Sequence, residues 1–280
     1  MVLSILLAGM VMTADPPPPT VVGPTQTEGC SGPPADYNRH VTAASDAFRA
    51  KDMAKVKAEL GAIVVACGES SQSWAARVYL ANFAAQAADY DTAWTMIRPV
   101  PRTVRSTFGA RPAYIAMQAL AAHKDLAGFN AERDALLAAS AAGLTDPAGI
   151  KGRQIETFTV NGSKVTAFEA QFPQDGFVRF FQFTIVPPGD YALPTSISVS
   201  QDAIGAALGG GDTFFVDRYD CGMHGTMRIV RGKPAYADLK AIVTAALQGQ
   251  TSFTSSTQHG GSGCAWPDFI VPGLQTPASK

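Results

Sequence analysis

Residues 75–100 read AARVYLANFAAQAADYDTAWTMIRPV, and this stretch decides the fold of the first half of the chain. It continues a helix that is expected to start near Ser73. The apolar stripe of that helix is formed at helical spacing by Trp74, Val78, Ala81 and Ala85. A second helix is expected over residues 90–100, because Pro99 and Pro101 cannot continue it. The stretch therefore predicts two helices joined by a short turn.

The same pattern extends on both sides of this stretch. Alanine-rich segments with helical periodicity predict further helices over residues 36–50, 52–67, 112–122 and 125–142. Six short helices joined by short turns predict three antiparallel hairpins over residues 36–145. The second helix of each hairpin opens with an Asp-x-Ala pattern, whose alanines are Ala54, Ala93 and Ala127. These alanines lie 39 residues apart (54 to 93) and 34 residues apart (93 to 127).

The 34-residue spacing is the period of tetratricopeptide (TPR) repeats, and this region resembles that family. The large, small, small and large positions of the family are matched here by Leu80, Ala81, Ala93 and Ile97. Ala84 departs from the pattern, because the family has an aromatic residue there. The resemblance covers residues 36–145 and implies a TPR-like helical solenoid with a protein or peptide partner. From the residues alone, a generic alanine-rich helical bundle is the alternative.

Residues 150–275 predict a second domain of the α+β class, in which one helix packs on an antiparallel sheet. Asn161-Gly162 suits a type I′ turn between strands 155–160 and 163–172, which places Phe158 opposite Val165. Further strands are expected over residues 177–186, 196–200, 213–219 and 226–231, with a short helical segment over 202–208. An amphipathic helix is expected between Pro234 and Gly249.

The N-terminus has the form of a secretory signal. The apolar residues 2–12 are followed by Thr13-Ala14 and then by a proline run, which predicts a signal peptide over residues 1–14. Residues 15–35 are then a proline-rich linker. No lysine or arginine precedes Arg39, so the usual basic start of such signals is missing. The alternative is a buried strand or helix; the proline run favours export, to the periplasm or outside the cell.

Four cysteines agree with export, because disulfides persist in oxidising compartments. They fall two in each half of the chain, and we expect one disulfide in each half: Cys30 with Cys67, and Cys221 with Cys264. Four cysteines allow three pairings, so the connectivity is open at this stage. Free thiols in a cytosolic protein are the alternative.

The C-terminal cysteines also belong to a candidate metal site. The residues Cys221, His224, His259 and Cys264 are ligand types of a Cys2His2 zinc site. In an exported protein we expect the disulfide instead, and therefore no cofactor. The alternative function is an envelope enzyme or metal-binding protein with zinc at these residues. Asp217 and Asp220 near His224 form a weaker acid–base candidate, because nothing in their spacing brings them together.

One local concentration of positive charge stands out between the second and third hairpins. It consists of Arg98, Arg102, Arg105 and Arg111. We predict that these residues bind a partner, which would be acidic or an anionic glycan. The alternative is a solvated loop that binds nothing.

The composition excludes several classes of protein. The chain has 22 basic and 23 acidic residues, which argues against a nucleic-acid partner. No apolar run reaches the roughly 18 residues of a membrane span. None of the patterns Ser-x-x-Lys, His-Glu-x-x-His or Cys-x-x-Cys occurs. We therefore expect an exported, non-catalytic module that binds a protein or peptide; a purely structural role in the cell envelope is the further alternative.

Overall fold

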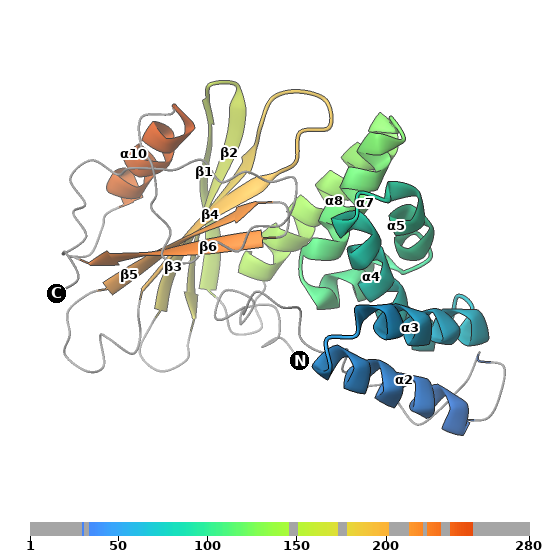
Figure 1. The fold of residues 1–280 in the computed structure, drawn as a ribbon. Helices are drawn as coiled ribbons and strands as arrows, with labels where there is room; N and C mark the ends of the chain where they lie inside the picture. Colours follow the sequence, from blue (N-terminus) through green and yellow to red (C-terminus); the bar gives the residue numbers. More distant parts are fainter. Residues whose placement is uncertain are drawn as a thin grey trace. The chain divides into compact units, whose positions relative to one another are not determined.

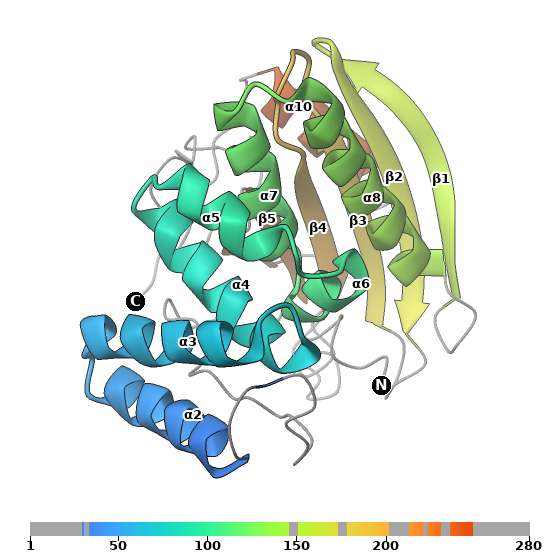
Figure 2. The same cartoon turned by 90° about the vertical axis from the view of Figure 1, so that its right-hand side faces the viewer.

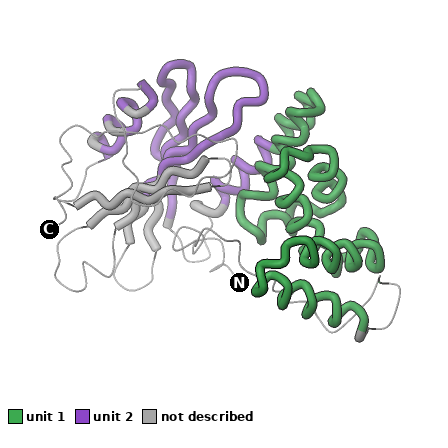
Figure 3. The backbone as a smooth tube through the Cα atoms, viewed as in Figure 1, with its two compact units in different colours: residues 1, 3–132 green, residues 2, 133–280 purple. Residues whose placement is uncertain are grey.

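A computed structural model describes Cys30 and residues 34–145, 151–172, 178–201, 213–220, 223–230 and 236–248. The chain divides into two compact units (Figure 3), which comprise Leu3–Glu132 and Arg133–Lys280. The first unit is helical. The second contains the antiparallel sheet, so the chain combines a helical N-terminal part with an α+β part, as predicted. No helix in the described part of the chain has the length and apolar character needed to cross a membrane.

The six predicted helices are all present, and they can be followed in Figures 1 and 2. They are α2 (Pro34–Arg49), α3 (Met53–Cys67), α4 (Ser71–Gln86), α5 (Tyr90–Ile97), α7 (Arg111–Ala122) and α8 (Leu126–Thr145). The boundary between the units falls inside α8. Helix α5 ends three residues before the predicted end: Arg98 keeps helical dihedrals, with φ of −55° and ψ of −44°, but Pro99 has no amide hydrogen to continue the helix. Two short elements were not predicted: α6 (Arg102–Arg105) and the 3-10 helix η2 (Ser106–Phe108).

The same turn joins the helices at three places in the first unit. The left-handed residues of these turns are Lys51, Ala88 and Lys124, with φ of 58°, 57° and 58°. The amide of the following aspartate donates a 2.9 Å hydrogen bond to a carbonyl five residues earlier: Asp52 to Ala47, Asp89 to Ala84 and Asp125 to Leu120. Each aspartate side chain then caps the next helix by accepting from the amides of Lys55, Thr92 and Gly128 respectively.

The positions of these turns correct the predicted alignment of the repeats at one place. The three capping aspartates lie 37 residues apart (52 to 89) and 36 residues apart (89 to 125). In the middle turn the residue equivalent to Asp52 is therefore Asp89, whereas the sequence pattern matched Asp91. Four residues after each cap stands a fully buried side chain, at Val56, Ala93 and Phe129. The repeat is thus present in both backbone and core.

Two apolar clusters fill the helical unit. The first is built from α2, α3 and α4, with Leu60 and Ile63 among its most buried members. The second is built from α4, α5 and α7, with Ile97 and Ile115 at its centre. Helix α4 contributes to both clusters, which explains why most of its residues are buried.

The second unit contains a six-stranded antiparallel sheet in the order β1-β2-β3-β4-β5-β6. Its strands are β1 (Lys151–Val160), β2 (Ser163–Phe172), β3 (Val178–Val186), β4 (Thr195–Gln201), β5 (Thr213–Asp220) and β6 (Met223–Val230). The predicted turn is confirmed, with Asn161 and Gly162 both at positive φ and Phe158 opposite Val165. The predicted helical segment over 202–208 lies outside the described residues.

Helix α10 (Tyr236–Leu247) packs on one face of this sheet, as expected. Leu239 and Val243 are buried against Phe181, Phe183 and other residues of the sheet core. Alternate residues of a strand point to opposite faces, and Gln182 on the other face donates a 2.9 Å hydrogen bond to Ser140 of α8. The last part of α8 therefore lies on the second face of the sheet.

Candidate functional site

The structure describes the cysteines of the first half of the chain. Cys30 and Cys67 form a disulfide with an S–S distance of 2.05 Å, which is compatible with the predicted pairing. Cys221, His259 and Cys264 lie outside the described residues, so the second disulfide and the zinc site stay predictions. His224 pairs with Tyr219 across β5 and β6, and Asp217 pairs with Thr226. No three described histidine, cysteine, aspartate or glutamate residues are grouped so as to hold a metal ion.

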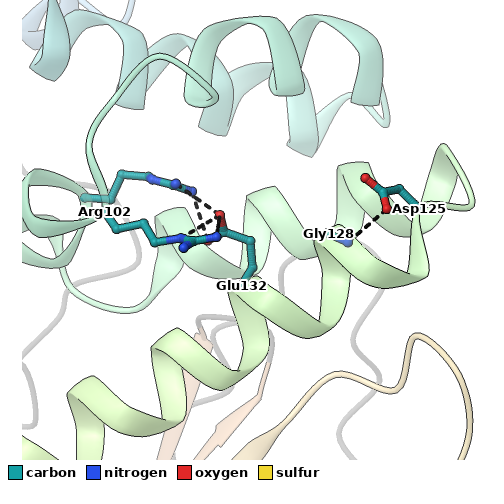
Figure 4. Close-up of polar contacts among 5 residues, drawn as sticks. Arg102, Asp125, Gly128 and Glu132 are labelled. Atoms are coloured by element: carbon teal, nitrogen blue, oxygen red, sulfur yellow. Dashed lines mark hydrogen bonds and ion pairs between the residues drawn. The ribbon is translucent and has the colours of Figure 1, made fainter.

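The four predicted arginines have different surroundings. Arg98 is exposed at the C-terminal end of α5. Arg111 donates a 3.0 Å hydrogen bond from Nε to Asn82 Oδ1 of α4. Arg102 and Arg105 converge on the carboxylate of Glu132 in α8 (Figure 4). The structure therefore brings two of the four arginines together and adds an acidic residue that the sequence pattern did not include.

Glu132 holds the two arginines in different ways. Arg105 pairs with it bidentately, through Nη1 to Oε2 and Nη2 to Oε1, both at 3.1 Å. Arg102 approaches the same Oε1 atom with Nε and Nη2, both at 3.0 Å. The side chains of Arg105 and Glu132 are 8% and 7% exposed, whereas that of Arg102 is 53% exposed. The buried Arg105–Glu132 pair therefore also binds the half-exposed guanidinium of Arg102.

Local sequence explains how this cluster assembles. A three-residue spacing in α6 places Arg102 and Arg105 on the same side of one helical turn. Gly128 allows α8 to start close to α7, since an added Cβ would lie 2.9 Å from Leu120 Cδ2 and 2.5 Å from Asp125 Oδ2. Asp125 caps α8 through the amide of this glycine (Figure 4). Glu132 follows about two turns after the cap, because an α-helix has 3.6 residues per turn.

The cluster carries an excess of positive charge. Two guanidinium groups share one carboxylate, and an arginine stays protonated at all ordinary pH values. No aspartate or glutamate occurs between Asp91 and Asp125, although all four arginines lie in that interval. The Nε–H of Arg105 is buried and has no hydrogen-bond partner among the described residues. The surface around Arg102 is therefore suited to an anionic group.

A cavity of about 140 Å³ lies beside the disulfide, between α2 and α3. Its wall includes Tyr37 and His40 together with both cysteines. A cavity of about 150 Å³ holds a benzene ring, so only a small molecule fits here. His40 is already engaged with Glu59, through a 2.6 Å bond from Nδ1 to Oε2. The charged residues Asp36 and Arg39 also line the cavity, and the buried Tyr37 hydroxyl has no hydrogen-bond partner among the described residues. The cavity therefore has polar as well as apolar walls.

A group of titratable side chains joins α10 to β1. Glu156 Oε1 accepts hydrogen bonds of 2.6 Å from the Tyr236 hydroxyl and 2.7 Å from Lys240 Nζ. These bonds lower the pKa of the Glu156 carboxyl, with the Lys240 bond as the largest cause. Burial, followed by the bond to Glu156, raises the pKa of Tyr236. A tyrosine that holds its proton more tightly is a poor general base, so we interpret this group as an anchor of the helix.

No protein-family model, curated protein or solved structure matches the chain. Among the described residues, the arginine cluster and the repeated helical turn are the features from which a function can be proposed. The arginines were found from their density in the sequence. Glu132 was missed, because the sequence does not show that Arg105 is buried and therefore needs a carboxylate from another element.

Proposed function

We propose that the helical unit is a TPR-like module that binds a protein or peptide segment of a partner, and that the protein acts without catalysis after export. The observation that supports the proposal most directly is the turn repeated at Asp52, Asp89 and Asp125, which has the same hydrogen-bond pattern each time. Helical-hairpin repeats stack into extended surfaces, and such surfaces bind peptides and proteins. The Cys30–Cys67 disulfide is compatible with an oxidising compartment.

The helices also provide a candidate binding surface. Helix α4 has one stripe of half-exposed and exposed residues at helical spacing, formed by Ala75, Tyr79, Asn82 and Gln86. We call this the α4 stripe. Arg111 of α7 is tied to it by the bond to Asn82, and Gln118 lies two turns further along α7. Amide, hydroxyl and guanidinium groups on neighbouring helices are suitable donors and acceptors for a peptide backbone.

A peptide-display selection against the intact chain tests this proposal. We expect enriched peptides whose binding, measured by fluorescence anisotropy, weakens at least tenfold in the double variant Gln86→Ala/Gln118→Ala. The melting temperature should change by much less than the binding, because neither side chain is buried. Val65→Ala is the matched control: Val65 is 84% exposed on α3, outside the α4 stripe. Failure to enrich any binding peptide, or equal binding by the double variant, would contradict the proposal.

A further inference from the structure

The cluster of Arg102, Arg105 and Glu132 has two positive charges and one negative charge, and Arg102 is its exposed arginine. Glu132 is fully engaged by Arg105, which pairs with both of its oxygens. Arg102 adds a second guanidinium to a carboxylate that is already neutralised. We propose that Arg102 is an anion receptor that binds the carboxylate side chains of an acidic peptide, and this inference rests on the peptide-binding function proposed above.

The receptor is held in place before any ligand arrives. Nε and Nη2 of Arg102 both contact Glu132 Oε1, so the plane of the guanidinium is fixed relative to α8. Glu132 itself is held by the buried Arg105. Arginine has five N–H donors, and Glu132 is the hydrogen-bond partner of Arg102 among the described residues. With half of the side chain exposed, the Nη1 group remains for a ligand that approaches from solvent.

Charge favours an acidic ligand at this point. The three side chains of the cluster sum to one positive charge, and exposed Arg98 stands four residues before Arg102. The acid-free interval between Asp91 and Asp125 leaves the segment without a competing carboxylate of its own. Guanidinium groups recognise carboxylates with planar, directional hydrogen bonds, as the Arg105–Glu132 pair itself illustrates.

A peptide is the favoured source of that carboxylate. The net charge of −1 and the pI of about 6.4 argue against a nucleic acid, which needs a broad basic surface. The positive segment connects α5 to α7 within the repeats, so an acidic residue of a bound peptide would meet a charge on the same helical unit. A phosphorylated or sulfated ligand offers related oxygens, and its preference over carboxylate would overturn the assignment.

The test uses fluorescein-labelled hexaglutamate and hexaglutamine, titrated with the intact, disulfide-bonded chain. We expect hexaglutamate to bind at about 20 mM salt, and we expect this binding to weaken as the salt concentration rises. Hexaglutamate should bind at least roughly tenfold more tightly than hexaglutamine. Arg102→Gln should weaken binding about tenfold, because one charge-assisted contact is lost. Arg49→Gln is the matched control: this arginine is 70% exposed and pairs with Asp46 at i,i+3 on α2.

The outcomes separate the two proposals. Equal binding of hexaglutamate by the wild type and Arg102→Gln, or no preference over hexaglutamine, overturns the receptor assignment. Tighter binding of hexa-phosphoserine at matched charge does the same. Display-selected peptides that are not enriched in acidic residues, and that bind Arg102→Gln as tightly as the wild type, would contradict the receptor assignment. The peptide-binding function would then still stand. If no peptide is selected at all, the function fails with it.

Discussion

Replacing Glu132 by glutamine leaves two guanidinium groups without the carboxylate between them. Both members of the inner pair are buried, with side-chain exposures of 8% for Arg105 and 7% for Glu132. Removing one partner of a buried ion pair costs about 3–5 kcal/mol, because the other charge stays buried without compensation. The half-exposed Arg102 adds less than about 1 kcal/mol, as surface pairs do. Glutamine keeps one carbonyl acceptor, so we expect a loss of about 3 kcal/mol.

Urea denaturation followed by circular dichroism measures this loss as a lower free energy of unfolding. A loss of about 3 kcal/mol is a large fraction of the roughly 5–15 kcal/mol that stabilises a typical domain. Asp134→Asn is the matched control, since Asp134 lies in the same helix, is 67% exposed and pairs with its neighbour Arg133. We expect this control to change the stability by less than about 0.5 kcal/mol. The reasoning about a buried charge is refuted if Glu132→Gln falls within that same range.

Three further predictions concern other parts of the molecule. Reduction of the Cys30–Cys67 bond should lower the free energy of unfolding by about 4 kcal/mol, because the bond closes a loop between residues that are 37 apart in sequence. Urea denaturation with and without reductant measures this loss. Asp89→Ala should lower the melting temperature more than Asp91→Ala, because Asp89 caps α5 whereas Asp91 makes an exposed bond to His123; equal effects would contradict the register of the repeat. The lowered pKa of Glu156 contributes stability that is present above its ordinary pKa of 4.5 and lost as pH falls through the lowered value; Glu156→Gln should abolish that part of an acid titration of stability.

The elements with strong local signals were predictable. The Asn161-Gly162 turn needs two residues at positive φ, and these two residue types tolerate it best, so strand pairing followed from the sequence. Pro99 and Pro101 likewise marked the end of α5. The register of the repeat was not predictable in the same way. The left-handed positions are occupied by lysine and alanine rather than glycine, so nothing in the residue types distinguishes Asp89 from Asp91 as the cap.

The candidate site was predictable in its residue types and not in its pairing. A local cluster of arginines is visible in the sequence, but the burial of Arg105 depends on α8, which is 27 residues away at Glu132. The four-residue helix α6 has no periodicity to recognise, because one helical turn is shorter than any repeat of the pattern. Which arginine is structural and which is available to a ligand is therefore decided by tertiary packing alone.

Stability and binding can be separated at this cluster. A buried ion pair is rarely more stabilising than an apolar pair of similar volume, so Arg105→Met/Glu132→Leu should unfold at a urea concentration equal to or above that of the wild type. The same double variant removes the carboxylate that orients Arg102. If the cluster positions Arg102 for an acidic peptide, this stable variant should bind hexaglutamate several-fold more weakly at about 20 mM salt. The Arg102 charge is retained, so the weaker binding would come from the lost preorganisation of its guanidinium. Unchanged binding would mean that the charge alone suffices and that the pairing with Glu132 plays no part in recognition. Loss of both stability and binding would mean that the ion pair is required for the fold, and the division of roles between Arg102 and Arg105 would then be wrong.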